Sequence, residues 1–474
     1  MTVPNQSTAS EKHLLTRAEA THYLETSRHA DVLRFIAELE ALSDPRLTVT
    51  LFGASPEGRA LPLLILAAAG LRTPAEARAT GLPVVLVING IHPGEVEGKE
   101  ASLMLCRDLL TGPMGDLLEH MVLLVVPLFN PDGNDRISPD HRVLNVAKLA
   151  GQDGPAGGVG TRANAAGINL NRDYMKQASL EMRQLQAQVC QAWQPHLTLD
   201  CHATNGSVHR FALTYDIPHT IASGRPEPIE FMRHRMLPTI TSRLKARTGL
   251  DTFYYGNFVT DEGGTGSGWM TYPHHPRFGS NYRGLTNRLD LLLETYSYLS
   301  FPERVFTTYE FIHETLKLVT EQASAIIEVV ESSQIPPARI AVAYRLEAFD
   351  APVEILTREP RALDGRPVSV VIPHFARFVG SHVVDRPWGY AVPDFVAEHL
   401  RRHGLAVAAL DADRNTAVEE ATVEEASGTA SRRILEASAV GEKEVRAHYA
   451  RADRRLRQGQ AVVTTEQPLG AIAV

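Results

Sequence analysis

The segment PVVLVINGIHPGE, residues 83–95, decides the fold class. Its first part is an uninterrupted apolar run, which is typical of a strand buried on both faces of a sheet. A helical pattern follows from about Val96 to Leu110, so the segment predicts a strand that leads directly into a helix. Between the two lie His92 and Glu95, whose side chains are both of types that bind metal ions.

Strand and helix patterns alternate from about residue 15 to residue 332. Further apolar strand patterns, of which the first two form a predicted hairpin, are Thr48–Gly53, Leu61–Ala67, Met121–Phe129, His196–Cys201 and Arg288–Leu293. Helical periodicity covers about Ser179–Trp193 and Pro302–Glu331. This alternation predicts a three-layer α/β/α domain in which helices cover both faces of the sheet.

The chain has 474 residues, too many for one ordinary core, which predicts two domains. The predicted parts are a disordered tail at 1–14, the α/β domain at 15–332, a linker at 333–339 and a smaller accessory α+β domain at 340–474. Within the last part we expect a helix near Val392–Arg402. Residues 415–458 are rich in charge and are predicted to be helical, with RAHYARADRRLRQ (446–458) as a solvated helix face.

Composition excludes several classes of partner. The formal net charge is -8, which argues against a nucleic acid or an anionic membrane surface, and no apolar run is long enough to cross a membrane. The N-terminus lacks a basic region followed by an apolar run, which predicts a cytoplasmic protein; a precursor without its leader, working outside the cytoplasm, would look the same. Cys106, Cys190 and Cys201 form neither a disulfide framework nor a metal-spaced set and are predicted to be free thiols.

A candidate metal site begins with His92 and Glu95, at the carboxyl end of a predicted strand, where α/β sheets place their ligands. His202 follows another strand and is the best candidate for a third ligand, since catalytic zinc takes three protein ligands and keeps one position open. Asp200, two residues earlier, points to the same side and is either an acceptor for a ligand's imidazole or a simple strand-end carboxylate. Taken singly, each histidine also fits a structural role.

Glu294 ends the apolar run LDLLLE. Burial disfavours the charged form of a carboxyl group, and this is the setting of a tuned general base. The alternative is an ion pair with an arginine such as Arg283 or Arg288.

Two arginines lie in the Gly- and Ala-rich stretch that follows residue 150. Arg172, in GINLNRDY with Asn171, has the planar fork that suits bidentate capture of a carboxylate. Arg162, in TRANAAG, could stabilise the oxyanion of a tetrahedral intermediate. The alternative for each arginine is a surface ion pair.

Five motifs follow one another along the chain, each at a predicted element boundary. They are HPGE (92–95), NPDG (130–133), RANAAGINLNR (162–172), DCH (200–202) and ETY (294–296). This series resembles the carboxypeptidase A-type zinc metallocarboxypeptidases, in their bacterial branch, over roughly residues 20–320. The stretch GASPEGRALPLLIL (53–66) is also similar to a hairpin of that family.

The resemblance implies a mixed eight-stranded sheet between helices, with residues 15–332 as the zinc peptidase catalytic domain. It implies one zinc ion per chain, bound by His92, Glu95 and His202. It also implies further roles: Glu294 as general base and acid, Asn171 and Arg172 as the clamp on the substrate's terminal carboxylate, Arg162 as the oxyanion arginine, and Tyr272, with Tyr282 as the fallback, as the tyrosine that covers the substrate.

The chain departs from the family pattern at three places. Pro93 and Gly94 stand where the family often has an arginine between the first two ligands. Asn169 replaces the aspartate that orients the first zinc histidine, so either Asn169 or Asp200 must take that role, or the orientation is looser. Ala203 and Thr204 replace the residues that follow the second histidine in the digestive enzymes.

These observations predict a zinc metallocarboxypeptidase that hydrolyses the C-terminal amide bond of peptides. One alternative is a zinc-dependent deacylase or amidase that acts on N-acyl amino acids or γ-linked cell-wall peptides. An alternative from another class is an inactive homologue that binds peptides. The ligand set favours zinc, although other divalent ions suit it as well. The sequence makes no prediction of the oligomeric state.

Overall fold

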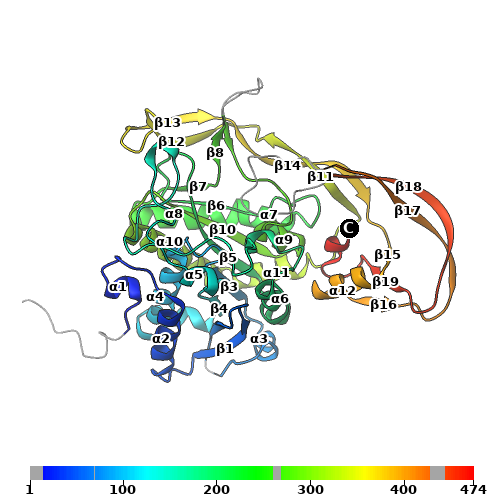
Figure 1. Ribbon diagram of the computed structural model, residues 1–474, viewed down its shortest axis with the longest axis horizontal. Helices are drawn as coiled ribbons and strands as arrows, with labels where there is room; N and C mark the ends of the chain where they lie inside the picture. The colour runs from blue at the N-terminus through cyan, green and yellow to red at the C-terminus, as the bar shows by residue number, and fades with distance from the viewer. Residues whose placement is uncertain (1–13, 69, 260–267, 428–443) are drawn as a thin grey trace, which may run out of the picture.

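The structure is a computed structural model of the chain and describes residues 14–68, 70–259, 268–427 and 444–474. Its centre is a mixed eight-stranded sheet, as predicted (Figure 1). In sheet order, the strands are β1 (Leu47–Ala54), β2 (Ala60–Leu66), β4 (Val122–Val126), β3 (Val84–Asn89), β5 (Leu197–Thr204), β10 (Leu289–Tyr296), β6 (Leu213–Asp216) and β7 (Thr252–Tyr254). The predicted hairpin is β1–β2.

The four central strands, β4, β3, β5 and β10, run parallel to one another. Their carboxyl ends therefore meet at one edge of the sheet. The register places Asn89 of β3 beside Cys201 of β5, and Glu294 of β10 beside His202. Residues that are far apart in sequence therefore lie close together at this edge of the sheet.

Successive residues of the central strands point to opposite faces of the sheet. In β3, Val85 and Val87 belong to one apolar cluster, whereas Val84, Leu86 and Ile88 belong to a second cluster on the other face. All five side chains are buried. The continuous apolar run in the sequence is explained by this burial on both faces.

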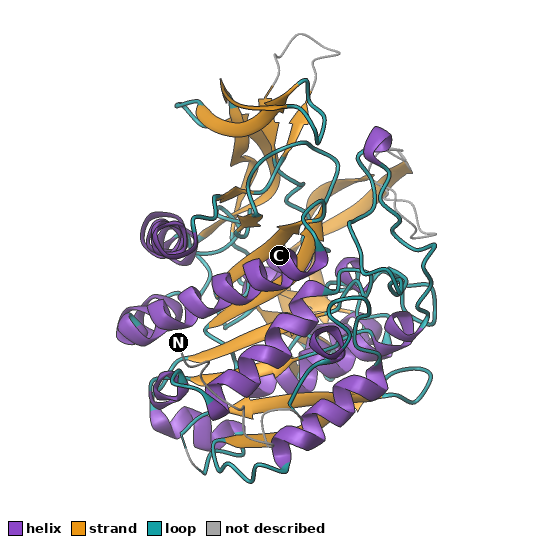
Figure 2. Ribbon diagram, turned by 90° about the vertical axis from the view of Figure 1, so that its left-hand side faces the viewer, coloured by secondary structure: helices purple, strands orange, loops and turns teal. Residues whose placement is uncertain are grey.

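Helices cover both faces, so the structure confirms the three-layer architecture (Figure 2). The first cluster is covered by α2 (His29–Glu40), α4 (Glu97–Thr111), α7 (Glu227–Phe231), α8 (Leu237–Thr248), α10 (Phe301–Glu321) and α11 (Ala323–Glu331). The second is covered by α3 (Pro74–Thr80), α6 (Leu180–Gln184) and α9 (Gly279–Leu285). Two π-helical segments, Leu185–Gln191 and Met232–Met236, continue α6 and α7, and two further short helices are α1 (Arg17–Ala20) and α5 (Pro131–Asp135).

Beyond the predicted linker, the chain is mostly β-structure. Its strands are β11 (Arg339–Ala348), β12 (Val353–Glu359), β13 (Arg366–Ile372), β14 (His374–Asp385), β15 (Gly389–Val392), β16 (Val407–Ala409), β17 (Arg414–Ser427), β18 (Glu444–Leu456) and β19 (Ala461–Thr464). The expected helix is α12 (Asp394–Arg402). Leu400 of α12 and Val463 of β19 pack in the second cluster, so this part of the chain completes the layer over that face.

One sheet crosses the predicted linker. β14 pairs with β9 (Gly268–Met270), which in turn pairs with β8 (Asn257–Val259). The division into two domains at residues 333–339 therefore remains a proposal. Residues 1–13 of the predicted tail lie outside the described residues, and Leu14 packs in the first apolar cluster.

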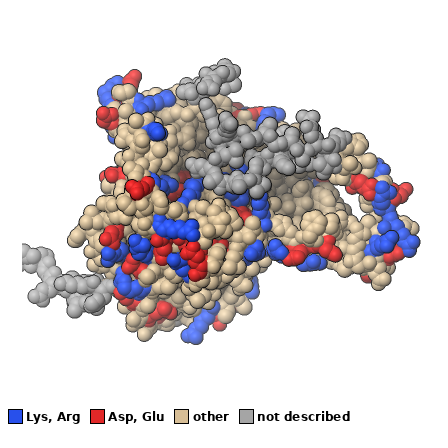
Figure 3. Space-filling model, viewed as in Figure 1, with Lys and Arg blue, Asp and Glu red and all other residues tan. Residues whose placement is uncertain are grey.

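The prediction of a helix over 415–458 is wrong where the structure describes this segment. β17 and β18 form a long antiparallel hairpin, and residues 428–443 between them lie outside the described residues. Alanine, glutamate and arginine favour a helix, but here Glu420 pairs with Arg454 and Glu419 lies near Arg451, across the two strands. Figure 3 shows acidic and basic side chains side by side on this hairpin, at the right of the view.

Two further features are the cysteines and the character of the helices. Cys106, Cys190 and Cys201 are free thiols, as expected. Among the described residues, none of the helices combines the length and the apolar character that crossing a membrane requires.

Candidate metal centre

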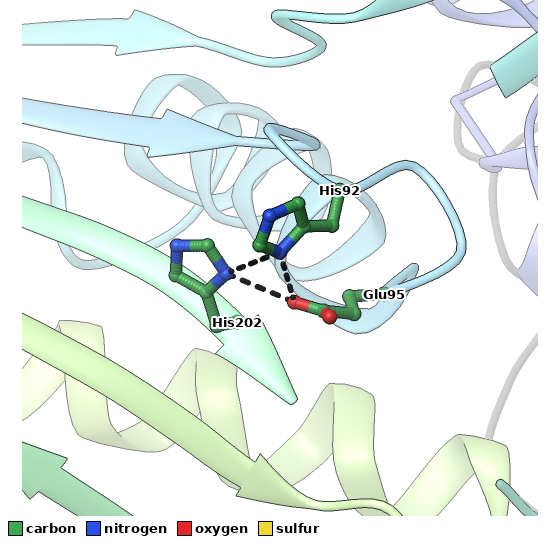
Figure 4. Close-up of side chains that lie close together, drawn as sticks. All are labelled: His92, Glu95 and His202. Atoms are coloured by element: carbon green, nitrogen blue, oxygen red, sulfur yellow. Dashed lines mark hydrogen bonds and ion pairs between the residues drawn. The ribbon is translucent and has the colours of Figure 1, made fainter. Parts of the chain in front are cut away.

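The proposed ligands lie at the carboxyl edge of the sheet. The chain leaves β3 at Asn89 and turns at Gly90, whose φ of 68° favours glycine. His92 and Glu95 then follow in the turn before α4, while His202 lies within β5, the neighbouring parallel strand. Figure 4 shows the three side chains pointing toward one point.

The distances within this group suit a metal ion. Nδ1 of His202 lies 3.2 Å from Nδ1 of His92 and 2.9 Å from Oε2 of Glu95, and Nδ1 of His92 lies 3.3 Å from the same oxygen. Zinc bonds of about 2.0–2.1 Å in a tetrahedral arrangement would separate ligand atoms by about 3.3 Å. Three donor atoms of the right type therefore lie at the spacing that a zinc ion requires.

Both imidazoles are held from behind by oxygen atoms. Nε2 of His92 lies 3.0 Å from Oδ1 of Asn169, and Nε2 of His202 lies 3.0 Å from Oδ1 of Asp200. Nε2 of His92 can donate its proton to Asn169, and the Asp200 carboxylate lies within ion-pair distance of Nε2 of His202, so that Nδ1 of each ring faces the other proposed ligands. Asn169 thus lies behind His92, and Asp200 lies behind His202.

The two histidines differ in charge environment. Burial, together with the positive charge of Arg162, lowers the pKa of His92 to about 3. Burial would also lower the pKa of His202, but Asp200 and Glu95 outweigh it and raise the pKa well above its usual value.

Glu95 is surrounded by cations. Its Oε1 accepts hydrogen bonds from Arg142 at 3.0 Å and from Arg162 at 3.2 Å. Although burial by itself would raise it, the pKa of Glu95 is held well below its usual value by His92 and Arg142. Of these two arginines, the sequence predicted a site role for Arg162 alone. Arg142 lies in a loop, and no motif distinguished it from a surface arginine.

Glu294 faces the same pocket from β10. It lies beside His202 in the strand register, and burial raises the pKa of its carboxyl group to about 8. The alternative of an ion pair with Arg283 or Arg288 is not found: Arg283 pairs with two other carboxylates, and Arg288 donates to backbone oxygens.

Asn171 and Arg172 border the proposed metal ligands. The Asn171 side chain lies between His202, whose Nε2 is 3.4 Å from Nδ2, and the backbone of Gly279, whose N–H donates to Oδ1 at 2.8 Å. The Arg172 guanidinium lies 4.2 Å above the centre of the Phe278 ring. Backbone and ring contacts thus fix the two polar side chains at the wall of the pocket.

Of the two tyrosine candidates, Tyr272 lines the pocket. Its ring packs between those of His219 and Phe278. Tyr282 instead points to the other side of α9, where its hydroxyl lies 2.8 Å from Nδ1 of His403. Tyr255 also lines the pocket, and no sequence signal had singled it out.

The pocket has a volume of about 740 Å³, which is large enough for a peptide end. It brings together eight of the residues proposed from the sequence for the site, whereas Asp200 and the fallback Tyr282 do not line it. The eight residues are His92, Glu95, Arg162, Asn171, Arg172, His202, Tyr272 and Glu294.

Solved structures to which the chain is similar include carboxypeptidases. A metallo-carboxypeptidase from Burkholderia cenocepacia is 19% identical, with 61% of this chain and 69% of that chain covered and a TM-score of 0.44. A metallo-carboxypeptidase from Pseudomonas aeruginosa, in complex with (2-guanidinoethylmercapto)succinic acid, is 20% identical, with 62% and 68% covered and a TM-score of 0.41. Carboxypeptidase A from Helicoverpa armigera is 14% identical, with 64% and 75% covered and a TM-score of 0.40.

Comparison of sequences is more specific. No curated protein matches the chain. Residues 32–197 match the family model for zinc carboxypeptidases, and this stretch contains His92, Glu95 and the loop with Asn171 and Arg172. This match makes residues 32–197 similar to the zinc carboxypeptidase family.

Proposed function

We propose that this protein is a zinc-dependent metallocarboxypeptidase that hydrolyses the C-terminal amide bond of peptides. The observation that carries the proposal is one pocket with three kinds of group: a three-donor candidate metal site, a half-buried carboxyl group with a raised pKa, and an arginine–asparagine pair. Each kind of group matches one requirement of the reaction. Arg142 and Arg162 add positive charge beside the metal ligands.

Glu294 is the proposed general base and acid. Zinc, when bound by His92, Glu95 and His202, supplies a Lewis acid that polarises a carbonyl and lowers the pKa of water. Glu294 takes a proton from the attacking water and then donates it to the nitrogen of the leaving amine. A carboxyl group whose pKa is raised by burial is suited to both steps, because it exchanges protons near neutral pH.

Asn171 and Arg172 are proposed to bind the free α-carboxylate of the substrate. The guanidinium fork accepts a carboxylate in two parallel hydrogen bonds, and the amide adds another donor. Fixing the chain end in this way aligns the scissile carbonyl with the base. Arg162 is proposed to stabilise the oxyanion, with Tyr272 closing over the bound end.

The proposal of a metal-dependent enzyme is tested first by metal content. Zinc per chain is measured by plasma mass spectrometry for the wild type, for His92→Ala and for the control His382→Ala, whose side chain is exposed. We expect about one zinc in the wild type and the control, and its loss in His92→Ala. A folded wild type without stoichiometric metal would instead favour the inactive homologue.

The substrate class is tested with matched compounds. A peptide with a free C-terminus is compared with the same peptide amidated, and with N-acetyl derivatives of the same terminal residue. We expect cleavage of the free peptide and little cleavage of the amide, since the amide removes the charge that Arg172 binds. Preference for the N-acetyl amino acid would support the deacylase alternative, which uses the same metal site and clamp.

A further inference from the structure

A second cavity, of about 280 Å³, lies at the opposite end of β5 from the metal ligands. Its walls come from the segment that precedes β5, from the turn between α9 and β10, and from the C-terminal part of the chain. Side chains that line it are Cys190, Gln194, Tyr282, Arg288, His403 and Leu469. None of these has a role in the proposed reaction. In Figure 1, α12 lies on the side of α6 and α9, and Leu400 of α12 packs in the same apolar cluster as Leu285 of α9.

Arg288 supplies a positive charge to the cavity without a matching carboxylate. Its Nη1 donates to the backbone oxygens of Gln194 at 2.8 Å and Pro195 at 3.0 Å. Within the described residues, no aspartate or glutamate lies within ion-pair distance of its guanidinium. Consistently, burial lowers the pKa of Arg288 to about 10, a value at which it remains charged at neutral pH.

The other ionisable groups of the wall are already satisfied. Arg283 is paired with Asp200, at 2.6 Å, and with Asp290. His403 has contacts at both ring nitrogens: Nδ1 lies 2.8 Å from the Tyr282 hydroxyl, and Nε2 lies 3.1 Å from a backbone oxygen. Burial lowers the pKa of His403 to about 4, so the ring is neutral. Among the groups that line this cavity, the uncompensated charge is therefore that of Arg288.

The remaining wall combines an apolar part with neutral polar side chains. Pro195, Pro468, Leu469 and the Tyr282 ring form the apolar part, and the polar side chains are those of Gln186, Gln191, Gln194, Thr198, Thr286 and Gln334. A volume of about 280 Å³ is at the lower end for ligand pockets, which suits a molecule of amino-acid size. We propose that this cavity binds a small carboxylate with an apolar body, its oxygens on Arg288 and its body against Leu469 and Tyr282.

The two sites are distinct although one strand joins them. Thr198 lines the second cavity, whereas His202 lines the first pocket. The two residues are four positions apart in β5, which corresponds to about 13 Å along a strand. Arg283 lies in the wall of the second cavity and also holds Asp200, which backs His202. A ligand in this cavity is therefore in contact with the support of the metal centre, not with the substrate.

Cys190 provides a local probe. It lines the second cavity and is half-buried, whereas Cys106 and Cys201 are buried elsewhere. The full chain is treated with iodoacetamide, and the rate of alkylation of each cysteine is followed by peptide mass spectrometry. Phenylacetate is the carboxylate probe, phenylacetamide its uncharged analogue, and inorganic phosphate an oxyanion without an apolar body.

We expect phenylacetate to slow alkylation of Cys190 several-fold at saturation, with phenylacetamide and phosphate having little effect. Arg288→Gln should abolish this protection, and Arg172→Gln, which changes the clamp of the first pocket, should retain it. Equal protection by phenylacetamide or by phosphate would overturn the proposed ligand chemistry. Protection that survives Arg288→Gln but is lost in Arg172→Gln would show that the probe acts from the first pocket and would overturn the second site. The comparison of the three probes on the wild type holds even if a variant does not fold.

Discussion

Arg283 and Arg288 flank the turn between α9 and β10, and their surroundings are opposite. Arg283 is buried and bound by Asp200 and Asp290, with the Tyr174 hydroxyl at 2.7 Å. Arg288 is partly exposed and bound by backbone oxygens. Burial tends to lower both pKa values; the carboxylates reverse this for Arg283, whose pKa is raised, but nothing reverses it for Arg288.

The difference separates a structural cation from one that is available to a ligand. Although burial by itself would raise the pKa of Asp200, His202 and Arg283 lower it, so the carboxylate keeps its charge and its hold on the imidazole. Arg283 thus supports the metal centre through charges that are mutually satisfied. Arg288 keeps a charge that a small anion could still neutralise. The predictions below test this contrast and the metal centre that depends on it.

The largest effect is expected at the metal centre itself. Glu294→Gln should lower turnover by roughly 10²–10⁴-fold, because the amide cannot accept the proton of the attacking water. Zinc content should stay at that of the wild type, since Glu294 is not among the three ligands. Steady-state hydrolysis of a free-ended peptide measures the loss, with the exposed Glu331→Gln as control. Turnover within a few-fold of the wild type would refute the assigned base.

The next effect is on stability. Arg283→Met should lower the free energy of unfolding by about 3–5 kcal/mol, because it leaves Asp200 and Asp290 buried without their cation. Urea unfolding of the metal-free protein measures this loss. Zinc affinity should also fall by roughly 10–100-fold, since Asp200 would no longer be fixed behind His202. Unchanged zinc affinity would contradict the supporting role of Arg283.

Asp216 and Asp200 are two buried carboxyl groups with different neighbours. It is as buried as Asp200, but its neighbours are the Thr271 hydroxyl, at 2.5 Å, and His219, which burial keeps neutral. Burial raises the pKa of Asp216 to about 7. From about pH 4 to pH 7 the unfolded chain ionises while the folded protein keeps the proton, so stability falls as the pH rises and the loss is complete above pH 7.

Asp216→Asn should remove this loss. We expect the variant to unfold at a higher temperature than the wild type at pH 8, by a margin equivalent to about 2–4 kcal/mol, and to show no gain at pH 4. Thermal unfolding at the two pH values measures the difference. A gain of equal size at both would mean that the effect comes from packing and not from ionisation.

Much of the metal centre could be predicted from the sequence because parallel strands end at one edge. The apolar runs before His92, His202 and Glu294 are long enough to identify the strands, and the chain direction then places the three side chains together. Asn171 and Arg172 were found through their motif, and the structure places them in the same pocket.

The contacts that depend on folding over long sequence separations could not be predicted. Nothing local indicates that Arg142 reaches Glu95 or that Arg283 reaches Asp200. The β17–β18 hairpin was missed for a related reason: its composition favours a helix, and the pairing partner that decides otherwise lies on the far side of residues 428–443.

The smallest effect is expected at the second cavity, and it completes the comparison of the two arginines. Arg288→Met should cost about 1 kcal/mol or less, because the two hydrogen bonds that it removes go to backbone oxygens, one of them on the exposed Gln194. Zinc content should not change, because Arg288 does not contact Asp200 or His202. Urea unfolding of Arg288→Met and of Arg283→Met, measured in parallel, gives the loss of unfolding free energy for each variant. Equal costs would mean that Arg288 is a structural residue, and its charge would then no longer indicate a ligand.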